Sequence, residues 1–329
     1  MAGLPGRVRP SQKFAVRRRR TEDRHRWDNT WIDRGPIPAL FYQRHKSTIL
    51  QPQFAGREAW MGLSGLTSLN LIVLALWNSQ DEETVAPSAY EWQAWMYRNF
   101  TTNITNLQQG RIWTLATASI SHQDALHFAG NMFALWLFGF PTYRVIGTRA
   151  FYGLYAVGGL ACSTTHVCHN LWLGRTAPPL TQQEIVWLEA HPGQPLDPHM
   201  QQRLATADRP ALGASGSVMA LAAVSAALFP LDKVQPNPLR GSQLVLPLPS
   251  AVLLFVVSDL VGITQPDASA VDHAGHLGGL AMGILYVTLA WYSKAGSFRI
   301  LHAHPTGGQL PLLYRIRQWR QGNNPWRNS

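Results

Sequence analysis

The sequence predicts an all-α membrane protein, a bundle of six transmembrane helices with basic N- and C-terminal tails. Six segments have the apolarity and the roughly 17–25 residues that a membrane-spanning helix needs. Basic charge is concentrated at the ends, because the first 59 residues hold 13 Lys or Arg and the last 37 hold 6, against 9 in the whole stretch between them. Basic ends around an apolar middle argue against a nucleic-acid-binding protein, which carries its basic groups on one folded face.

The connections between the six segments support this topology. An even number of spans puts both tails on one side, and their Lys and Arg residues mark that side as the inner one. The second and fourth connections are net positive and lie inside, whereas the first, third and fifth are net negative and lie outside. The first connection contains "EWQAWMYRNF", which is typical of an interfacial amphipathic helix. The predicted segments are 61–77, 127–143, 150–173, 212–229, 244–263 and 273–292.

The N-terminal 20 residues are rich in Arg, contain no acidic residue and lack the apolar stretch of a secretory signal. This composition is typical of an organelle transit peptide. A disordered basic tail and a nuclear-localisation run are the alternatives. We therefore divide the chain into a targeting or disordered segment at 1–59, a helical domain at 60–292 and a basic tail at 293–329. Cys162 and Cys168 lie in one apolar run and are predicted to be buried free thiols.

A serine in "LGASGSVMAL" stands where the fourth segment begins. The esterase pattern G-x-S-x-G fails here, because Ser217 occupies the place of the second glycine. Ser215 nevertheless shares its depth with other polar groups, since the second, fourth and sixth segments all enter from the outer side. The polar residues near these three entries are His127, Asn131, Ser215, His273 and His276.

A serine, a histidine and an Asn/His pair at one depth could supply a nucleophile, a base and oxyanion donors. Packing is the simpler explanation for the small residues alone. Gly213, Gly216, Gly279 and Gly283 are predicted to allow close helix packing, and the last two have GxxxG spacing. We expect His166 and His169 to lie toward the inner end of the third segment, in helix-capping or interhelical hydrogen bonds.

Three short motifs, "HFAGN", "GASG" and "AGHLGG", resemble those of the rhomboid intramembrane serine proteases. They occur in the family's order over residues 60–292, and "GRIWTLATASISHQDALHFAGNMFALWLFG" is most similar to the mitochondrial branch. The resemblance implies a rhomboid-like bundle with Ser215 as nucleophile and His276 as general base. It also implies that His127, Asn131 and the Ser215 backbone N–H bind the oxyanion. His276 is preferred to His273 because the family's base directly precedes an x-G-G step.

The resemblance further implies an intramembrane serine endopeptidase of the mitochondrial inner membrane. Its partners would be transmembrane protein substrates and the lipid bilayer, with no cofactor, no metal and no nucleic acid. The alternative is a catalytically inactive relative that binds membrane clients, although such relatives typically lack the serine or the histidine. The sequence departs from the family at Met219, where an aromatic residue is common, and in the order of Arg111 and Trp113. No additional helix is expected before the six-helix domain.

Overall fold

The computed structural model describes residues 42–43, 56–79, 87–190, 198–230, 232–234, 245–265 and 271–293. All of them belong to the compact unit Pro36–Ser329. The predicted transit peptide and nearly all of the two basic tails lie outside the described residues. The described helices are α2 (Gly56–Trp77), α3 (Pro87–Phe100), α4 (Ile104–Gln108), α5 (Thr114–Thr117), α6 (Ala125–Trp172), α7 (Gln182–Ala190), α8 (Pro198–Thr206), α9 (Ser215–Leu228), α10 (Leu248–Ile263) and α11 (His273–Ser293).

The predicted helical character is confirmed for the described part of the chain, with one small addition. Three two-residue strands, β1 (Tyr42–Gln43), β2 (Lys233–Val234) and β3 (Leu246–Pro247), form an antiparallel sheet in the order β1-β2-β3. Such short strands carry no period-2 pattern that sequence reasoning could detect. The predicted interfacial segment lies within α3, and helix α2 begins at Gly56, so the last residues assigned to the N-terminal segment are helical.

Helix α2 has one buried face. Its buried residues recur every three or four positions, as a helix packed on one side requires: Ala59, Leu63, Leu66, Asn70, Val73 and Trp77. Helices α2 and α6 are long and apolar enough to cross a membrane. The other side of α2 carries exposed Met61, Leu71 and Ile72, which suits a lipid-facing surface.

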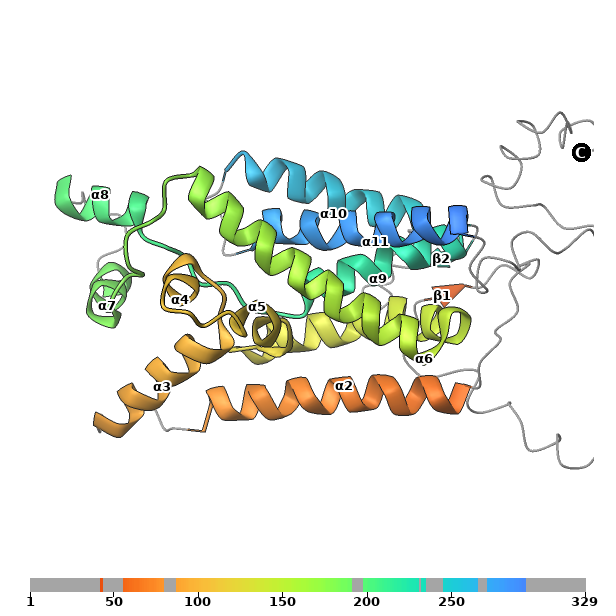
Figure 1. Cartoon of the computed structure of the whole chain (residues 1–329), viewed down its shortest axis with the longest axis horizontal. Helices are drawn as coiled ribbons and strands as arrows, with labels where there is room; N and C mark the ends of the chain where they lie inside the picture. Colours follow the sequence, from red (N-terminus) through yellow and green to blue (C-terminus); the bar gives the residue numbers. More distant parts are fainter. Residues whose placement is uncertain are drawn as a thin grey trace, which may run out of the picture. The chain divides into compact units, whose positions relative to one another are not determined.

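Helix α6 contains two of the predicted segments in one run of 48 residues. A straight helix of that length would extend about 72 Å, more than twice the ~30 Å hydrocarbon core of a bilayer. The run is broken at Gly147, whose φ of 79° and ψ of 172° are available to glycine but costly for other residues. The chain turns back at this point, so α6 has two arms that run side by side with the rest of the bundle (Figure 1).

Helix α9 lies at the centre of the bundle and contacts α6, α10 and α11 (Figure 1). Twelve of its 14 residues are buried, which is typical of a helix that is apolar all round.

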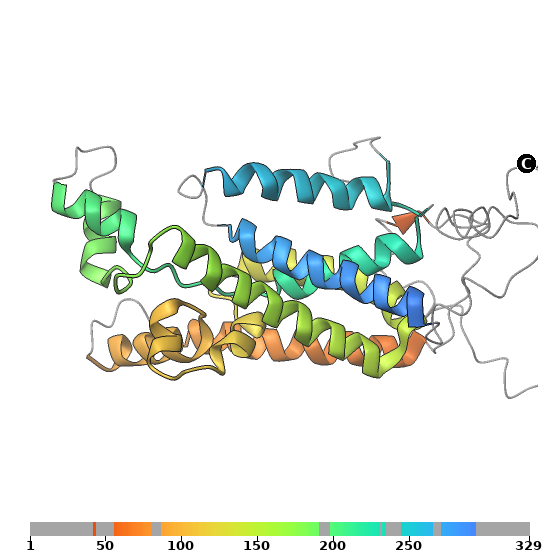
Figure 2. The ribbon, with the colours of Figure 1, turned by 45° about the horizontal axis from the view of Figure 1, so that its top comes forward.

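Helix α10 packs against α11 and α9 at the edge of the bundle (Figure 2). Most of its exposed residues are large and apolar, and a surface patch of this kind suits contact with lipid: Leu253, Leu254, Phe255, Val257, Leu260 and Val261.

Two sequence expectations are corrected by the helix surfaces and bounds. Cys168 is exposed and Cys162 is half-buried, so the prediction that both cysteines are buried is wrong for Cys168, which lies on an outward face of α6, and is met only in part by Cys162. Helices α9 and α10 start three to four residues later than predicted, at Ser215 and Leu248. In α9 the cause is Gly213, whose φ of 127° is incompatible with a helix.

Candidate active site

The polar residues singled out in the sequence line one cavity. It has a volume of about 1440 Å³, and Ser215, His276, His127 and Asn131 all contribute to its wall together with His273. The first residues of α6, α9 and α11 therefore face a common space, which the connections between 78 and 126 and between 174 and 211 also border. Within the described residues no group of three or more His, Cys, Asp or Glu side chains is arranged to hold a metal ion.

Ser215 is the first residue of α9. The segment before it is non-helical and is fixed by two backbone hydrogen bonds. The Gly213 N–H donates to the Ala118 carbonyl over 2.9 Å, and the Ala211 N–H donates to the Thr102 carbonyl over 2.9 Å. The first backbone N–H groups of a helix have no partner within it and carry partial positive charge. Ser215 thus stands at a helix end that favours a negative oxygen nearby.

His127 and Asn131 lie beside the turn that leads into α9. The Asp124 carboxylate caps α6 by accepting the N–H groups of Leu126 and His127, both over 2.9 Å, and so fixes the first turn. A Cβ placed on Gly213 would lie 2.8 Å from His127 Cε1 and 3.9 Å from Asn131 Nδ2. Only glycine at position 213 leaves room for the imidazole. The side chains of His127 and Asn131 therefore lie beside a residue that is two positions before Ser215 in the chain.

The glycines of α9 and α11 bring these helices into backbone contact. A Cβ on Gly279 would collide with the backbone oxygen, carbonyl carbon and Cα of Gly216, and a Cβ on Gly283 would collide with the Ala220 oxygen. Gly216 itself packs against Cys162 of α6, which also approaches Gly275. Ser215 and His276 are the neighbours of Gly216 and Gly275, so the same contacts hold both at the junction of three helices.

The ring of His276 is oriented by a carboxylate that the sequence reasoning missed. Asp259 of α10 is only 4% exposed, and its Oδ1 lies 3.0 Å from His276 Nδ1 and 2.8 Å from His273 Nδ1. The signal was present, because a carboxylate within an apolar membrane segment is costly and suggests function by default. In the described residues no hydrogen bond joins the His276 ring to Ser215. Catalytic hydrogen bonds are often long before substrate binds.

His273 is turned toward α10. A Cβ on Gly262 would collide with its Cγ, Cδ2 and Nε2 atoms, so the ring lies flat against the backbone of α10 next to Asp259. Its Nδ1 is engaged by the same carboxylate oxygen as that of His276. His273 therefore anchors α11 to α10, which leaves His276 as the better-placed base.

The expectation for His166 and His169 is wrong in position. Both border the cavity, because the second arm of α6 runs back from the turn at Gly147 and its late residues lie near the first residues of α9 and α11. His166 Nδ1 lies 3.1 Å from Asp272 Oδ1, and its Nε2 lies 2.8 Å from the Arg209 carbonyl. Burial raises the pKa of Asp272, but His166 and the Gly275 N–H outweigh it, so the net shift is downward. Asp272 is thus engaged with His166 and not with the His276 ring.

A further histidine supports the turn before Ser215. His122 is fully buried, and its Nε2 accepts the Ala214 N–H over 3.4 Å. Burial, with a smaller contribution from nearby His127, lowers the pKa of His122 from 6.5 to about 3. The ring is therefore neutral at physiological pH and acts as an acceptor. It was missed because nothing in its immediate sequence distinguishes it from a loop histidine.

Two other residues of the "LGASGSVMAL" motif are structural. Ser217 is fully buried, and its hydroxyl donates to the Tyr155 carbonyl over 2.7 Å, which excludes it as an accessible nucleophile. Met219 belongs to the buried apolar core.

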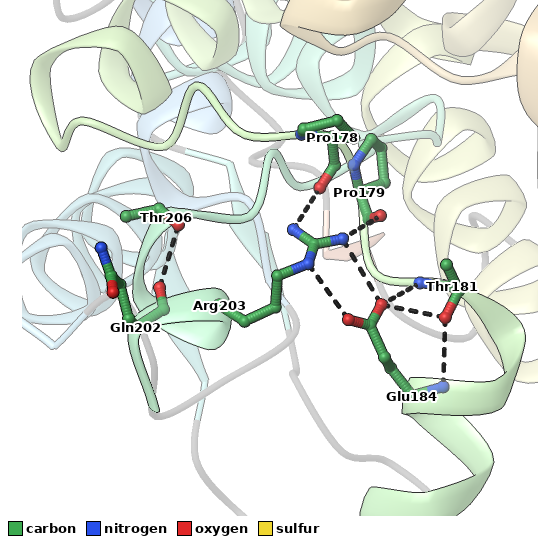
Figure 3. Close-up of polar contacts among 7 residues, drawn as sticks. All are labelled: Pro178, Pro179, Thr181, Glu184, Gln202, Arg203 and Thr206. Carbon is green, nitrogen blue, oxygen red and sulfur yellow. Dashed lines mark hydrogen bonds and ion pairs between the residues drawn. The ribbon is translucent and has the colours of Figure 1, made fainter. Parts of the chain in front are cut away.

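The connection between 174 and 211 forms a cap with helices α7 and α8. The Arg203 guanidinium donates to the carbonyls of Pro178 and Pro179 over 2.6 and 2.8 Å and to Glu184 Oε1 over 3.1 Å (Figure 3). Glu184 also accepts the Thr181 N–H, which is the main cause of its lowered pKa. Pro179 and residues of both helices border the cavity, so this cluster fixes part of its wall.

Comparisons with known proteins agree with this architecture. Residues 109–293 match the family model for the rhomboid domain. The chain is similar to RHOMBOID-like protein 12, mitochondrial, of Arabidopsis thaliana, with 27% identity covering 75% of this chain and 65% of that protein. It is similar to presenilin-associated rhomboid-like protein, mitochondrial, of Homo sapiens, with 24% identity covering 75% of this chain and 54% of that protein.

Rhomboid protein 1, mitochondrial, of Saccharomyces cerevisiae is 31% identical over 54% of this chain and 41% of its own length. The chain thus spans less than two thirds of each of these relatives. No solved structure matches it significantly. The mitochondrial relatives and the apolar helices together indicate a multi-pass mitochondrial membrane protein. With more than half of its length matched by the family model, the chain belongs to the rhomboid family, in its mitochondrial branch.

Proposed function

We propose that this protein is an active intramembrane serine endopeptidase that cleaves transmembrane or membrane-adjacent segments with a Ser215–His276 dyad. One observation carries the proposal. Ser215 at the N-terminus of α9, His276 in the first turn of α11 and the His127/Asn131 pair of α6 border a single cavity. Family membership makes a protease-like function the natural reading of this arrangement.

The reaction follows from the chemistry of these groups. The Ser215 Oγ attacks the scissile carbonyl carbon while its proton passes to the His276 Nε2, giving a tetrahedral oxyanion. The Ser215 backbone N–H, the His127 ring and the Asn131 amide stabilise that oxygen. Asn131 Nδ2 already donates to the His127 carbonyl over 3.0 Å, and its second hydrogen is available for the oxyanion. The C–N bond then breaks, and His276 returns the proton to the leaving amine.

Hydrolysis of the acyl-enzyme needs water below the membrane surface. The cavity of about 1440 Å³ is far larger than the ~30 Å³ share of one liquid water molecule, and its wall includes charged side chains such as Arg98 and Asp208. A water molecule activated by His276 attacks the acyl carbon and releases Ser215. The substrate helix must unwind locally, because a helical amide is shielded by its own hydrogen bonds.

We further propose six spans in the mitochondrial inner membrane. Helix α2, the two arms of α6, and helices α9, α10 and α11 account for them. Helix α9 extends only about 21 Å at ~1.5 Å per residue, which places Ser215 below the surface if the inner end of α9 lies at the opposite face. The non-helical segment before it is tolerated at that depth because it borders protein and a polar cavity.

The test is cleavage of a purified single-span reporter whose transmembrane segment carries a Gly-Pro pair near its outer end. Wild type should cut it, whereas Ser215→Ala and His276→Ala should lose at least about 1000-fold in kcat/KM. Ser217→Ala is the matched control, because its hydroxyl is buried in a bond to Tyr155. Equal cutting by wild type and both dyad variants would refute the proposal. Binding without cutting by wild type would instead favour the inactive, client-binding relative.

A further inference from the structure

A carboxylate stands directly behind the proposed base. Asp259 lies one turn before the end of α10, is 4% exposed, and directs a single oxygen toward the Nδ1 atoms of both His276 and His273. An ionised carboxylate is costly to bury in a membrane protein. Asp259 is buried where α10 packs against the first turn of α11.

This contact determines which nitrogen of His276 carries its hydrogen. A carboxylate can only accept hydrogen bonds, so each histidine that bonds to it through Nδ1 must carry the hydrogen there. The Nε2 of neutral His276 is then unprotonated and able to accept the Ser215 proton. The opposite tautomer would present an N–H to the serine and could not act as its base.

The position of the carboxylate also suits the charge that develops during the reaction. When His276 accepts the serine proton, the imidazolium lies 3.0 Å from an opposite charge in a site shielded from bulk water. His273 holds the same oxygen over 2.8 Å and is itself seated on Gly262, so Asp259 is fixed from a second side.

We propose that Asp259 is a positioning residue for the His276 base, so that the working unit is a Ser215–His276–Asp259 relay shared by three helices. This inference rests on the proposed protease function. A role confined to holding α10 against α11 is the competing explanation, because His273 and Gly262 already join these helices.

The kinetic test uses the full-length protein in detergent micelles and the same single-span reporter. Asp259→Asn should lower kcat about 100-fold or more, as loss of general acid–base catalysis does, with KM changed by less than about threefold. Asp272→Asn is the matched control, since it also removes a carboxylate bound to a histidine but makes no hydrogen bond to the His276 ring. Its kcat should stay within about tenfold of wild type.

The outcomes separate this inference from the proposed function. If Ser215→Ala still cleaves the reporter, the protease function itself fails. If Ser215→Ala is inactive while Asp259→Asn keeps the wild-type kcat, only the role of Asp259 is refuted. An equal loss in Asp259→Asn and Asp272→Asn would also refute it, by showing a general effect of removing a carboxylate that is bound to a histidine.

A spectroscopic measurement on wild type covers the case in which Asp259→Asn does not fold. Nitrogen-15 NMR of histidine-labelled protein, with the His276 signals assigned by their loss in His276→Gln, should show a pyrrole-type Nδ1 and a pyridine-type Nε2. The reversed assignment would overturn the inference.

Discussion

Ser215 depends on the residues that precede it as much as on its own hydroxyl. Gly213 admits the His127 ring, Ala214 donates its N–H to His122, and the helix then begins at Ser215. Any side chain at position 213 would need both a costly positive φ and the space that the imidazole occupies. The turn therefore couples the proposed nucleophile to His122 of the preceding connection and to His127 of α6.

His122 gives a pH-dependent prediction. The pKa of His122 falls from 6.5 in the unfolded chain to about 3 in the folded chain. As the pH falls below 6.5, His122 therefore takes up a proton in the unfolded chain while it stays neutral in the folded chain. Its contribution to stability is complete above pH 6.5 and is lost as the pH falls toward 3, with a slope of up to about 1.4 kcal/mol per pH unit.

Thermal unfolding in detergent between pH 8 and 5 checks this prediction. The unfolding temperature of wild type should decrease below pH 6.5, and His122→Phe should show a smaller decrease. His199→Phe, which removes an exposed histidine of α8, should keep the wild-type profile. An unchanged pH profile in His122→Phe would contradict the account.

Single residues also show where sequence reasoning works and where it stops. Ser215, His127, Asn131 and His276 could be proposed because each lies near the start of a segment that enters from one side. Asp259 lies near the end of its segment, and its link to His276 depends on how α10 packs. No spacing along the chain encodes that contact.

At the level of the helices, the contact between α9 and α11 is the most sensitive to added volume. Gly279→Ala would push a methyl group into the backbone of Gly216, which cannot move aside as a flexible side chain would. We expect a loss of about 1–3 kcal/mol of stability, together with reduced cleavage, because the dyad spans this contact.

Gly153→Ala is the control for Gly279→Ala. It lies within α6, and a Cβ there meets nothing within 4 Å. Alanine should leave stability unchanged or raise it by up to about 1 kcal/mol through its higher helix propensity. Differential scanning fluorimetry of both variants, with the reporter assay, tests the pair. Equal unfolding temperatures would mean that α9 and α11 do not touch as described.

The α7–α8 cap gives a second prediction about an element. Arg203 uses the planar fork of its guanidinium to bond two carbonyls and a carboxylate, a geometry that lysine cannot reproduce. Arg203→Lys should loosen the cap locally, while the unfolding temperature changes little because the cluster lies near the surface.

Limited proteolysis with chymotrypsin measures that loosening. Cleavage within 174–211 should be faster in Arg203→Lys than in wild type, whereas Gln202→Ala, an exposed neighbour, should match wild type. Identical digestion of all three proteins would show that the Arg203 cluster does not hold the cap.

Helix boundaries mark another limit of the sequence pattern. Apolarity located the helices that form the main core, α2, α6, α9, α10 and α11, but it extended α9 to residue 212 and gave no warning of its start at Ser215. A positive φ at Gly213 is a property of the folded chain, and the residues around it are as apolar as the helix that follows.

At the scale of the whole molecule, the alternation of charge predicts that both tails lie on the matrix side. In mitoplasts, protease added from outside should leave intact an epitope tag inserted just before α2, downstream of the predicted transit peptide, and one at the C-terminal end. It should cut the connection 174–211. A tag at one end that is degraded while the other survives would require an odd number of spans and would contradict the six-span arrangement.

The central claim is that His276 activates Ser215 as the nucleophile. Reaction with a fluorophosphonate tests it most directly, because the attacking serine oxygen displaces fluoride and keeps the phosphonyl group. Peptide mapping by mass spectrometry should find the label on Ser215 in wild type and little or none in His276→Ala. Labelling at another residue, or equal labelling of Ser215 in His276→Ala, would contradict the account.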